Sequence, residues 1–275
     1  MTTPVDPDVF REFEVGGWEE VGDAYHRFIG PVTGRVIDPL LDAARVAAKA
    51  RVLDVATGPG YVAHRAAARG ASVIGVDVSA SMVELASRIH PGIEFSEADA
   101  ERLPFGAGSF DAVAANFLLG HLARPEPTAL ELARMLKSGG FLALSWWDVP
   151  ERARILGVFV DAVKEAGAVP PPDLPPGPPM FLFSTDDELV KLLTTARLRG
   201  VEVRSLAFAH RIAISDDLWD GFLAGTVRTR ALVRGQTEDM QRRIRAALDR
   251  LLRPYAARDG FEIPVSVKIA VGKKP

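Results

Sequence analysis

The 275-residue sequence contains no cysteine, which excludes disulfides, thiolate metal sites and a cysteine nucleophile. No apolar run approaches the ~20 residues that a membrane-spanning helix needs, and residues 1–6 lack the basic and apolar pattern of a signal peptide. The formal net charge of −3 gives no general attraction to nucleic acid. These absences predict a cytoplasmic protein, and the hydrophobic content of 48% is ample for a large core.

The most informative stretch is residues 51–61, RVLDVATGPGY. Its first half is a short apolar run with β-branched residues, which is typical of a buried parallel strand. Gly58 and Gly60 allow a sharp turn and a close approach to a ligand. A helix is expected from Tyr61 onward, so its free N–H groups face the loop. Strand, glycine loop and helix in this order open the nucleotide site of a doubly wound sheet.

Acidic residues at two later strand ends strengthen this interpretation. Asp77 ends the expected strand 72–77, at roughly the twenty-residue spacing at which a carboxylate meets ribose hydroxyls. The alternative is that Asp77 is simply a solvated strand end. Asp99 follows the next expected strand and is placed to accept a hydrogen bond from an adenine amine. Met82 is expected to lie under the adenine ring, in the core, or both.

Strands and helices alternate along the rest of the chain. Further strands are expected at residues 110–117, 141–147, 201–208 and 262–271, with helices at 128–137 and 151–166 between them. Residues 169–179 hold seven prolines, which keeps them out of any sheet. The alternation predicts an α/β fold with a doubly wound, Rossmann-like sheet of seven strands.

Two helical segments stand outside this alternation. Residues 8–46 are amphipathic and expected to form short helices, broken at Gly16-Gly17 and Gly30-Pro31. About fifty residues separate the sixth and last strands, which is long for such a connection, and helices are expected there near 216–233 and 237–255. We therefore expect an N-terminal helical cap at residues 1–46 and a main domain at 47–275, with a lid insertion at about 209–258.

Five linked motifs show a family resemblance. They are VLDVATGPG at residues 52–60, GVD at 75–77, ADA at 98–100, LPF with FD at 103–105 and 110–111, and RMLKSGG at 134–140. In this order, over about a third of the chain, they resemble the class I S-adenosylmethionine (SAM) methyltransferases. The similar branch contains ubiquinone/menaquinone-biosynthesis enzymes and other small-molecule methyltransferases. One departure is Ala56, where many members have glycine.

The resemblance implies a strand order of 3-2-1-4-5-7-6 with the last strand antiparallel. It also implies that the cofactor is SAM and the product S-adenosyl-L-homocysteine. Glycines 58 and 60 would face the methionine part, Asp77 the ribose, Asp99 and Ala100 the adenine, and Asn116 and Phe117 the sulfonium. The complete set of expected cofactor contacts is Asp54, Ala56, Gly58, Gly60, Asp77, Val78, Met82, Asp99, Ala100, Asn116 and Phe117.

Two residues are candidate catalytic groups. A base is needed only where the acceptor must lose a proton. His121 follows the fourth strand and is expected either to be that base or to orient the backbone of its loop. Asp148 ends the fifth strand and is expected either to be the base or to cap the next helix.

The acceptor contacts are expected to come from the cap, the fifth strand and the lid: Trp18, Tyr25, Trp147, Phe222 and Arg230. Trp146 and Trp147 point to opposite faces of a strand, so one belongs in the core and the other beside the acceptor. Lid aromatics with Arg230 suit an apolar acceptor carrying a carboxylate or similar anion. The alternative is that this lid face seals the core and its arginines are solvated.

Three classes of function remain. The first is methyl transfer to oxygen, nitrogen or carbon of a small molecule, in a monomer or homodimer. No nucleic-acid partner is expected, since residues 116–119 (NFLL) lack the Asn-Pro-Pro-aromatic motif of base-amine methyltransferases. The second is a SAM-fold protein that acts as a cyclase or binding module. The third is an NAD-dependent oxidoreductase, because Gly58-x-Gly60-x-x-Ala63 fits the dinucleotide pattern. Asp54, Asp99 and the missing second nucleotide-binding half disfavour the third class. The sequence shows no cluster of acids and histidines, so no metal site is expected.

Overall fold

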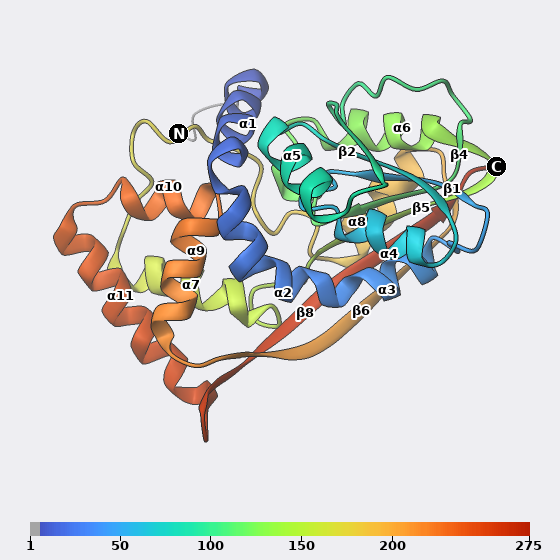
Figure 1. Cartoon of the computed structure of the whole chain (residues 1–275). Helices are drawn as coiled ribbons and strands as arrows, with labels where there is room; N and C mark the ends of the chain where they lie inside the picture. The colour runs from blue at the N-terminus through green and yellow to red at the C-terminus, as the bar shows by residue number, and fades with distance from the viewer. Residues whose placement is uncertain (1–5) are drawn as a thin grey trace.

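The computed structural model describes residues 6–275 and is built on one mixed sheet (Figure 1). The strand order is β3-β2-β1-β4-β5-β8-β6, and a short strand, β7, pairs with β8. The strands are β1 Arg51–Val55, β2 Ser72–Asp77, β3 Glu94–Glu97, β4 Phe110–Asn116, β5 Leu136–Trp147, β6 Arg199–Ile212, β7 Ala256–Ala257 and β8 Gly260–Lys273. Because β8 is the seventh long strand and runs antiparallel to both β5 and β6, the predicted order is confirmed.

The central strands are apolar because both faces of the sheet are covered. Leu53, Val113 and Leu142 pair side by side across β1, β4 and β5, and each is fully buried. Such near-continuous apolar runs are typical of parallel strands. Since these strands are parallel, the residues that follow each of them meet at one edge of the sheet.

Helices follow most of the strands: α4 Tyr61–Ala68, α5 Ala80–Ile89, α6 Pro125–Met135, α7 Arg154–Ala166 and α8 Asp186–Thr195. The α5 helix begins where its cap predicts, because the Ser79 hydroxyl accepts the Met82 N–H at 3.2 Å. The proline-rich residues 169–179 contain neither helix nor strand.

The N-terminal layer consists of α1 Pro7–Ala24, the π-helical turn η1 Tyr25–Ile29, α2 Gly30–Thr33, the 3₁₀ turn η2 Gly34–Val36 and α3 Ile37–Ala43. Residues 1–5 of the predicted cap lie outside the described residues. The predicted break at Gly16-Gly17 is wrong, because α1 continues through both glycines. A Cβ at Gly17 would overlap the Val227 side chain. The glycine therefore lets α1 pack closely on the segment that follows α9.

The connection between β6 and β8 contains α9 Ser215–Gly225, α10 Arg228–Arg234, α11 Glu238–Leu252 and the 3₁₀ turn η4 Arg253–Tyr255. The single predicted helix at 216–233 is wrong, because Thr226 is extended (φ −129°, ψ 152°) and ends α9. Its hydroxyl donates to the Phe222 carbonyl at 2.7 Å. Figure 1 shows β6 and β8 running past the rest of the sheet toward α9 and α11, with α1 beside α9.

Candidate active site

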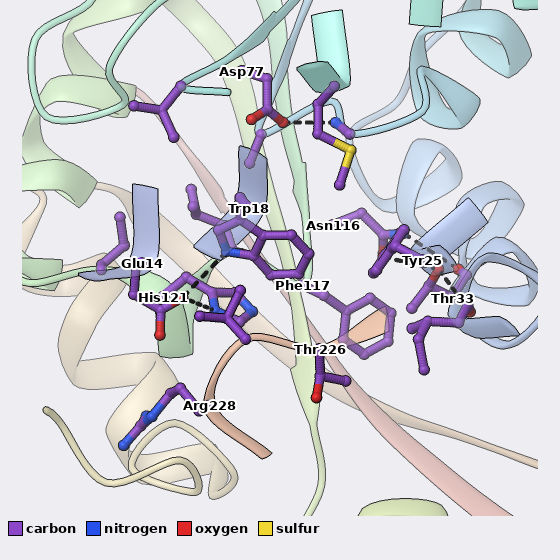
Figure 2. A pocket seen from close by; sticks show the side chains of 18 of the residues that line it. Glu14, Trp18, Tyr25, Thr33, Asp77, Asn116, Phe117, His121, Thr226 and Arg228 are labelled. Atoms are coloured by element: carbon purple, nitrogen blue, oxygen red, sulfur yellow. Dashed lines mark hydrogen bonds and ion pairs between the residues drawn. The ribbon is translucent and has the colours of Figure 1, made fainter. Parts of the chain in front are cut away.

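One cavity lies at the carboxyl ends of β1, β2 and β4, with α1, η1 and the α9–α10 segment around it (Figure 2). Most of the residues expected to contact a ligand line it: Trp18, Tyr25, Ala56, Gly58, Asp77, Val78, Met82, Asp99, Ala100, Asn116, Phe117, His121, Trp147 and Phe222. Four of the expected residues do not line it: Asp54, Gly60, Asp148 and Arg230.

The glycine loop depends on left-handed backbone. Gly58 has φ +50° and Gly60 has φ +80°, a region that glycine adopts without a Cβ penalty. No atom would lie within 4 Å of a Cβ at Gly58, whereas a Cβ at Gly60 would lie 2.7 Å from Cζ of Phe95. The loop therefore leaves open space at Gly58, while Gly60 contributes a close backbone contact.

Asp77 fixes the loop from the end of β2. One oxygen accepts the Gly58 N–H at 2.8 Å and the other accepts the Ser79 N–H at 3.1 Å. Burial raises the pKa of Asp77, although these backbone bonds oppose the shift. A carboxylate has about four acceptor positions, so Asp77 keeps capacity for two ligand hydroxyls.

Asp54 lies behind the loop and outside the cavity, so its expected cofactor contact finds no counterpart in the lining. It is fully buried, and its Oδ2 accepts the Thr57 hydroxyl at 2.6 Å and the Ala63 N–H at 2.9 Å. Burial raises its pKa to about 7. Asp54 therefore ties the loop to the start of α4.

Asp99 joins the cofactor loops to the N-terminal layer. Its Oδ1 accepts the Glu101 N–H at 2.9 Å, and its Oδ2 accepts from Nε of Arg11 on α1 at 2.9 Å. One acceptor position on Oδ1 remains for an amine. The adenine-binding end that the motifs predict is therefore also an anchor for α1.

Aromatic side chains form the opposite wall of the cavity. The rings of Phe117 and Trp147 lie 4.4 Å apart. Trp146 is fully buried in the core and its ring also reaches the cavity lining. Tyr25 packs edge-on against Trp18 and donates to the Thr33 hydroxyl at 3.2 Å. Burial raises the pKa of Tyr25 to about 12, so it is a neutral hydrogen-bonding group and not a base.

Asn116 is held by its neighbours. Its amide nitrogen donates to the Thr33 carbonyl at 3.3 Å, and its amide oxygen accepts from Ser145 at 2.6 Å. Phe117 follows with φ +59°, a strained conformation for an aromatic residue. The end of β4 is therefore rigidly shaped where the sulfonium was expected.

His121 lies in the 3₁₀ turn η3 Leu119–His121 and faces a residue that sequence reasoning missed. Its Nδ1 lies 2.9 Å from Oε2 of Glu14, and Glu14 is 3% exposed. Figure 2 shows the other ring nitrogen directed away from Glu14 toward the interior of the cavity. A lone glutamate on an amphipathic helix gives no signal that its side chain is buried.

Arg228 lines the cavity in place of Arg230. Arg228 donates to the Pro178 carbonyl at 2.9 Å and lies over the Phe10 ring. Burial lowers the pKa of its guanidinium, while the Glu14 charge opposes the shift. Arg230 instead pairs with Glu20 at 2.8 Å. Because the helix is broken at Thr226, Arg228 reaches the cavity and Arg230 does not. The prediction of one continuous helix could not show this.

Asp148 does not line the cavity and is occupied by structural contacts. Arg152 binds it with nitrogen–oxygen distances of 2.7 and 2.8 Å, and the Ser266 hydroxyl donates at 2.7 Å. Burial raises the pKa of Asp148, but these bonds outweigh it and leave the pKa below its ordinary value. These contacts join β5 to β8 and to Arg152. Asp148 does not cap the next helix, because α7 begins at Arg154 with Ala153 as its N-cap.

Residues 53–144 match the family described as methyltransferase domain. The match covers about a third of the chain. The demethylmenaquinone methyltransferase of Renibacterium salmoninarum is 33% identical over 127 residues, 46% of this chain and 54% of that protein. The one from Clavibacter sepedonicus is 40% identical over 103 residues, 36% and 42% of the two chains. The chain therefore spans about half the length of the curated relatives it matches.

Solved structures share the fold of this chain. YcgJ of Bacillus subtilis has a TM-score of 0.57 at 22% identity, covering 88% of this chain and 99% of that one. A putative methyltransferase from an antibiotic biosynthesis pathway of Anabaena variabilis has a TM-score of 0.58 at 19% identity, with coverage of 86% and 96%. The predicted resemblance and fold are confirmed. The matches do not favour a dinucleotide oxidoreductase or a non-methylating protein.

The residues of the cavity fit SAM, the cofactor that the family match supports. Asp77 keeps acceptor capacity for the ribose, and Gly58 leaves open space beside it. Among residues 6–275, no three acids and histidines converge as metal ligands. No helix in the same range is both long and apolar enough to cross a membrane.

Proposed function

We propose that the protein transfers the methyl group of SAM to a small-molecule acceptor. The observation that carries this proposal is the composition of one continuous cavity. At one end lie Gly58, Asp77 and Asp99, which follow strand ends as in the family motifs. At the other lie an aromatic wall and His121. A cofactor and an acceptor can thus bind side by side in one cavity.

The sulfonium of bound SAM supplies an activated methyl group: a bond forms from the acceptor atom to the methyl carbon as the carbon–sulfur bond breaks, and its electron pair goes to sulfur. The protein must hold the reacting atoms about 3–3.5 Å apart and in line, away from water. The rigid turn after β4 and the rings of Phe117, Trp146 and Trp147 suit that task.

We propose that the acceptor is covered by a lid at residues 209–258 and by the N-terminal cap at 1–46, placed over a SAM-binding domain at 47–275. Phe222, Thr226 and Arg228 reach the cavity from the lid, and Trp18 reaches it from the cap. Arg228, and not the predicted Arg230, is the cation that would orient the acceptor. A cytoplasmic location, a monomeric or homodimeric state and the lack of a nucleic-acid partner remain predictions.

Calorimetry with S-adenosylhomocysteine tests the cofactor site. Asp77→Ala removes a carboxylate that accepts charge-assisted bonds, and one such bond contributes about 1.5–3 kcal/mol. We expect affinity to fall about tenfold to a hundredfold. Asp187→Ala, an exposed position on α8, is the matched control and should bind normally. Tight NAD binding without S-adenosylhomocysteine binding would overturn the proposal.

A radiolabelled methyl group tests the transfer. The protein is incubated with methyl-labelled SAM and a panel of phenols, enols, amines and carboxylic acids, and the labelled products are separated. Arg228→Ala should raise the acceptor KM about tenfold or more, as expected for loss of a charged hydrogen bond, and leave S-adenosylhomocysteine affinity unchanged. Arg234→Ala, an exposed arginine at the end of α10, is the control. Loss of cofactor affinity and melting temperature together in Arg228→Ala would assign the segment a structural role only.

A further inference from the structure

Packing alone does not explain the buried carboxylate of Glu14. It lies on α1 and is 3% exposed, and burying an ionised group is costly unless it is paired and hydrogen-bonded. Its Oε2 accepts the indole N–H of Trp18 at 3.2 Å and lies 2.9 Å from Nδ1 of His121. Its Oε1 is buried and has no hydrogen-bond partner in the described part of the chain. An apolar residue would fill this place at a lower cost.

The ring of His121 is held on several sides. Trp18 packs against it at 5.0 Å with an interplanar angle of 87°, and Trp146 packs at 5.5 Å and 80°. A Cβ at Gly120 would overlap the Trp146 ring, so the glycine beside His121 is required for this packing. With Nδ1 facing Glu14, the ring can present only Nε2 to the cavity, as Figure 2 shows.

The donors around Glu14 determine which ring nitrogen carries the proton. An indole N–H only donates, so Oε2 acts as an acceptor toward Trp18. Arg228 lines the same end of the cavity as Glu14, so a positive charge lies near this carboxylate. An ionised carboxylate only accepts, and therefore Nδ1 of His121 must donate. The lone pair of neutral His121 is then on Nε2, facing the cavity.

We propose that Glu14 is a positioning residue that holds His121 in the Nδ1–H tautomer, and that the acceptor therefore carries an ionisable hydroxyl. This inference rests on the proposed methyl transfer. As the oxygen–methyl bond forms and the carbon–sulfur bond breaks, the hydroxyl proton moves to Nε2. The carboxylate of Glu14 stabilises the resulting imidazolium, which returns the proton to water after the product leaves. Because Glu14 comes from α1, the base is complete only when the cap is docked.

Nitrogen NMR of the ring reports the tautomer without any acceptor. Protein labelled with ¹⁵N-histidine is bound to S-adenosylhomocysteine, and long-range ¹H–¹⁵N spectra are recorded above pH 8. With five histidines in the chain, His121→Asn assigns the signal. The wild type should show Nδ1–H for His121. Glu14→Leu removes the acceptor and should shift the ring to Nε2–H, the form that free imidazole side chains prefer in water.

Glu14→Gln is the matched variant. Its amide oxygen can still accept from Trp18 and Nδ1, so the tautomer should be kept while the charge is lost. With a phenol that the wild type methylates, His121→Ala should lower kcat about 10²–10⁴-fold. Glu14→Leu should lower kcat about 10²-fold at unchanged KM for SAM, and Glu14→Gln should recover part of it.

Each outcome decides between the two proposals. An Nε2–H ring in the wild type, or a tautomer that Glu14→Leu leaves unchanged, overturns the positioning role even if S-adenosylhomocysteine binds. If Glu14→Leu does not fold, the wild-type and Glu14→Gln spectra still decide the tautomer. Absence of S-adenosylhomocysteine binding would instead overturn the proposed function, and the spectrum of the unliganded protein would still test the dyad.

Discussion

The two ends of the cavity are built in different ways. At the cofactor end, Gly58, Asp77 and Asp99 each follow a consecutive parallel strand, and backbone N–H groups hold both carboxylates. At the acceptor end, Glu14, His121 and Arg228 come from three segments that are far apart in the sequence. The first end is fixed by the topology of the sheet. The second exists only when α1 and the segment after α9 dock on that sheet.

Because of this difference, we expect the two ends of the cavity to tolerate different kinds of substitution. A change at the cofactor end acts through backbone geometry, because the loop conformation itself makes the site. A change at the acceptor end acts through side chains, because those residues sit on ordinary helices and a turn. Helices can exchange side chains without losing their shape. A protein built this way can change its acceptor while keeping its cofactor.

The largest expected effect is at Gly60. Gly60→Val introduces a β-branched residue at φ +80° and places a Cβ 2.7 Å from Cζ of Phe95. Strain in this region costs about 1–3 kcal/mol, and overpacking adds about 1–3 kcal/mol. We expect S-adenosylhomocysteine affinity to fall more than about a hundredfold, with a lower melting temperature, as measured by calorimetry and thermal unfolding.

Gly167→Val separates strain from overlap. Gly167 caps α7 at φ +73°, and no atom lies within 4 Å of its Cβ position. This variant should lose stability but keep cofactor affinity. If Gly60→Val binds as well as Gly167→Val, then the loop geometry does not make the site, and the contrast between the two ends is wrong.

The same contrast explains what sequence reasoning could predict. The strand order was predictable from the family resemblance. The glycine loop and Asp77 were predictable because a parallel sheet brings successive strand ends to one edge. Glu14 and Arg228 were not, because no local pattern reports which helix docks beside His121. The sequence also does not show that α9 ends at the extended residue Thr226, after which Arg228 reaches the cavity and Arg230 does not.

The next largest effect is expected at Asp54, in the way the unfolding free energy depends on pH. Burial raises its pKa from 3.8 to about 7, so between pH 4 and 7 the folded protein holds a proton that the unfolded chain releases. Its contribution to the unfolding free energy therefore falls as pH rises through this window. About three pKa units at 1.36 kcal/mol each set an upper limit of about 4 kcal/mol. Asp54→Asn should lack this decline in urea unfolding between pH 4.5 and 8.

Asp148→Asn is the control of opposite sign. Its bonds with Arg152 and Ser266 lower its pKa, so its stabilisation is present above the ordinary carboxyl pKa and is lost as pH falls below it. The wild type should exceed Asp148→Asn in stability at pH 7, with the gap closing toward pH 3. If the unfolding free energies of the wild type and Asp54→Asn instead depend on pH in the same way, Asp54 is ionised in the folded protein over the whole range from pH 4.5 to 8.

The smallest expected effect is at Ala56, where the family resemblance predicts glycine. Ala56 has φ +54°, which costs a residue with a Cβ about 1–2 kcal/mol, whereas glycine adds about 0.5–1 kcal/mol of chain entropy on folding. Ala56→Gly should therefore raise the unfolding free energy by at most about 1 kcal/mol, with cofactor affinity unchanged. Lys49 is exposed and has φ +66°. If backbone strain is the cause, Lys49→Gly should raise the unfolding free energy by a similar amount. A loss of affinity in Ala56→Gly alone would mean that the methyl group of Ala56 packs on the cofactor, so that the cofactor end, too, depends on a side chain.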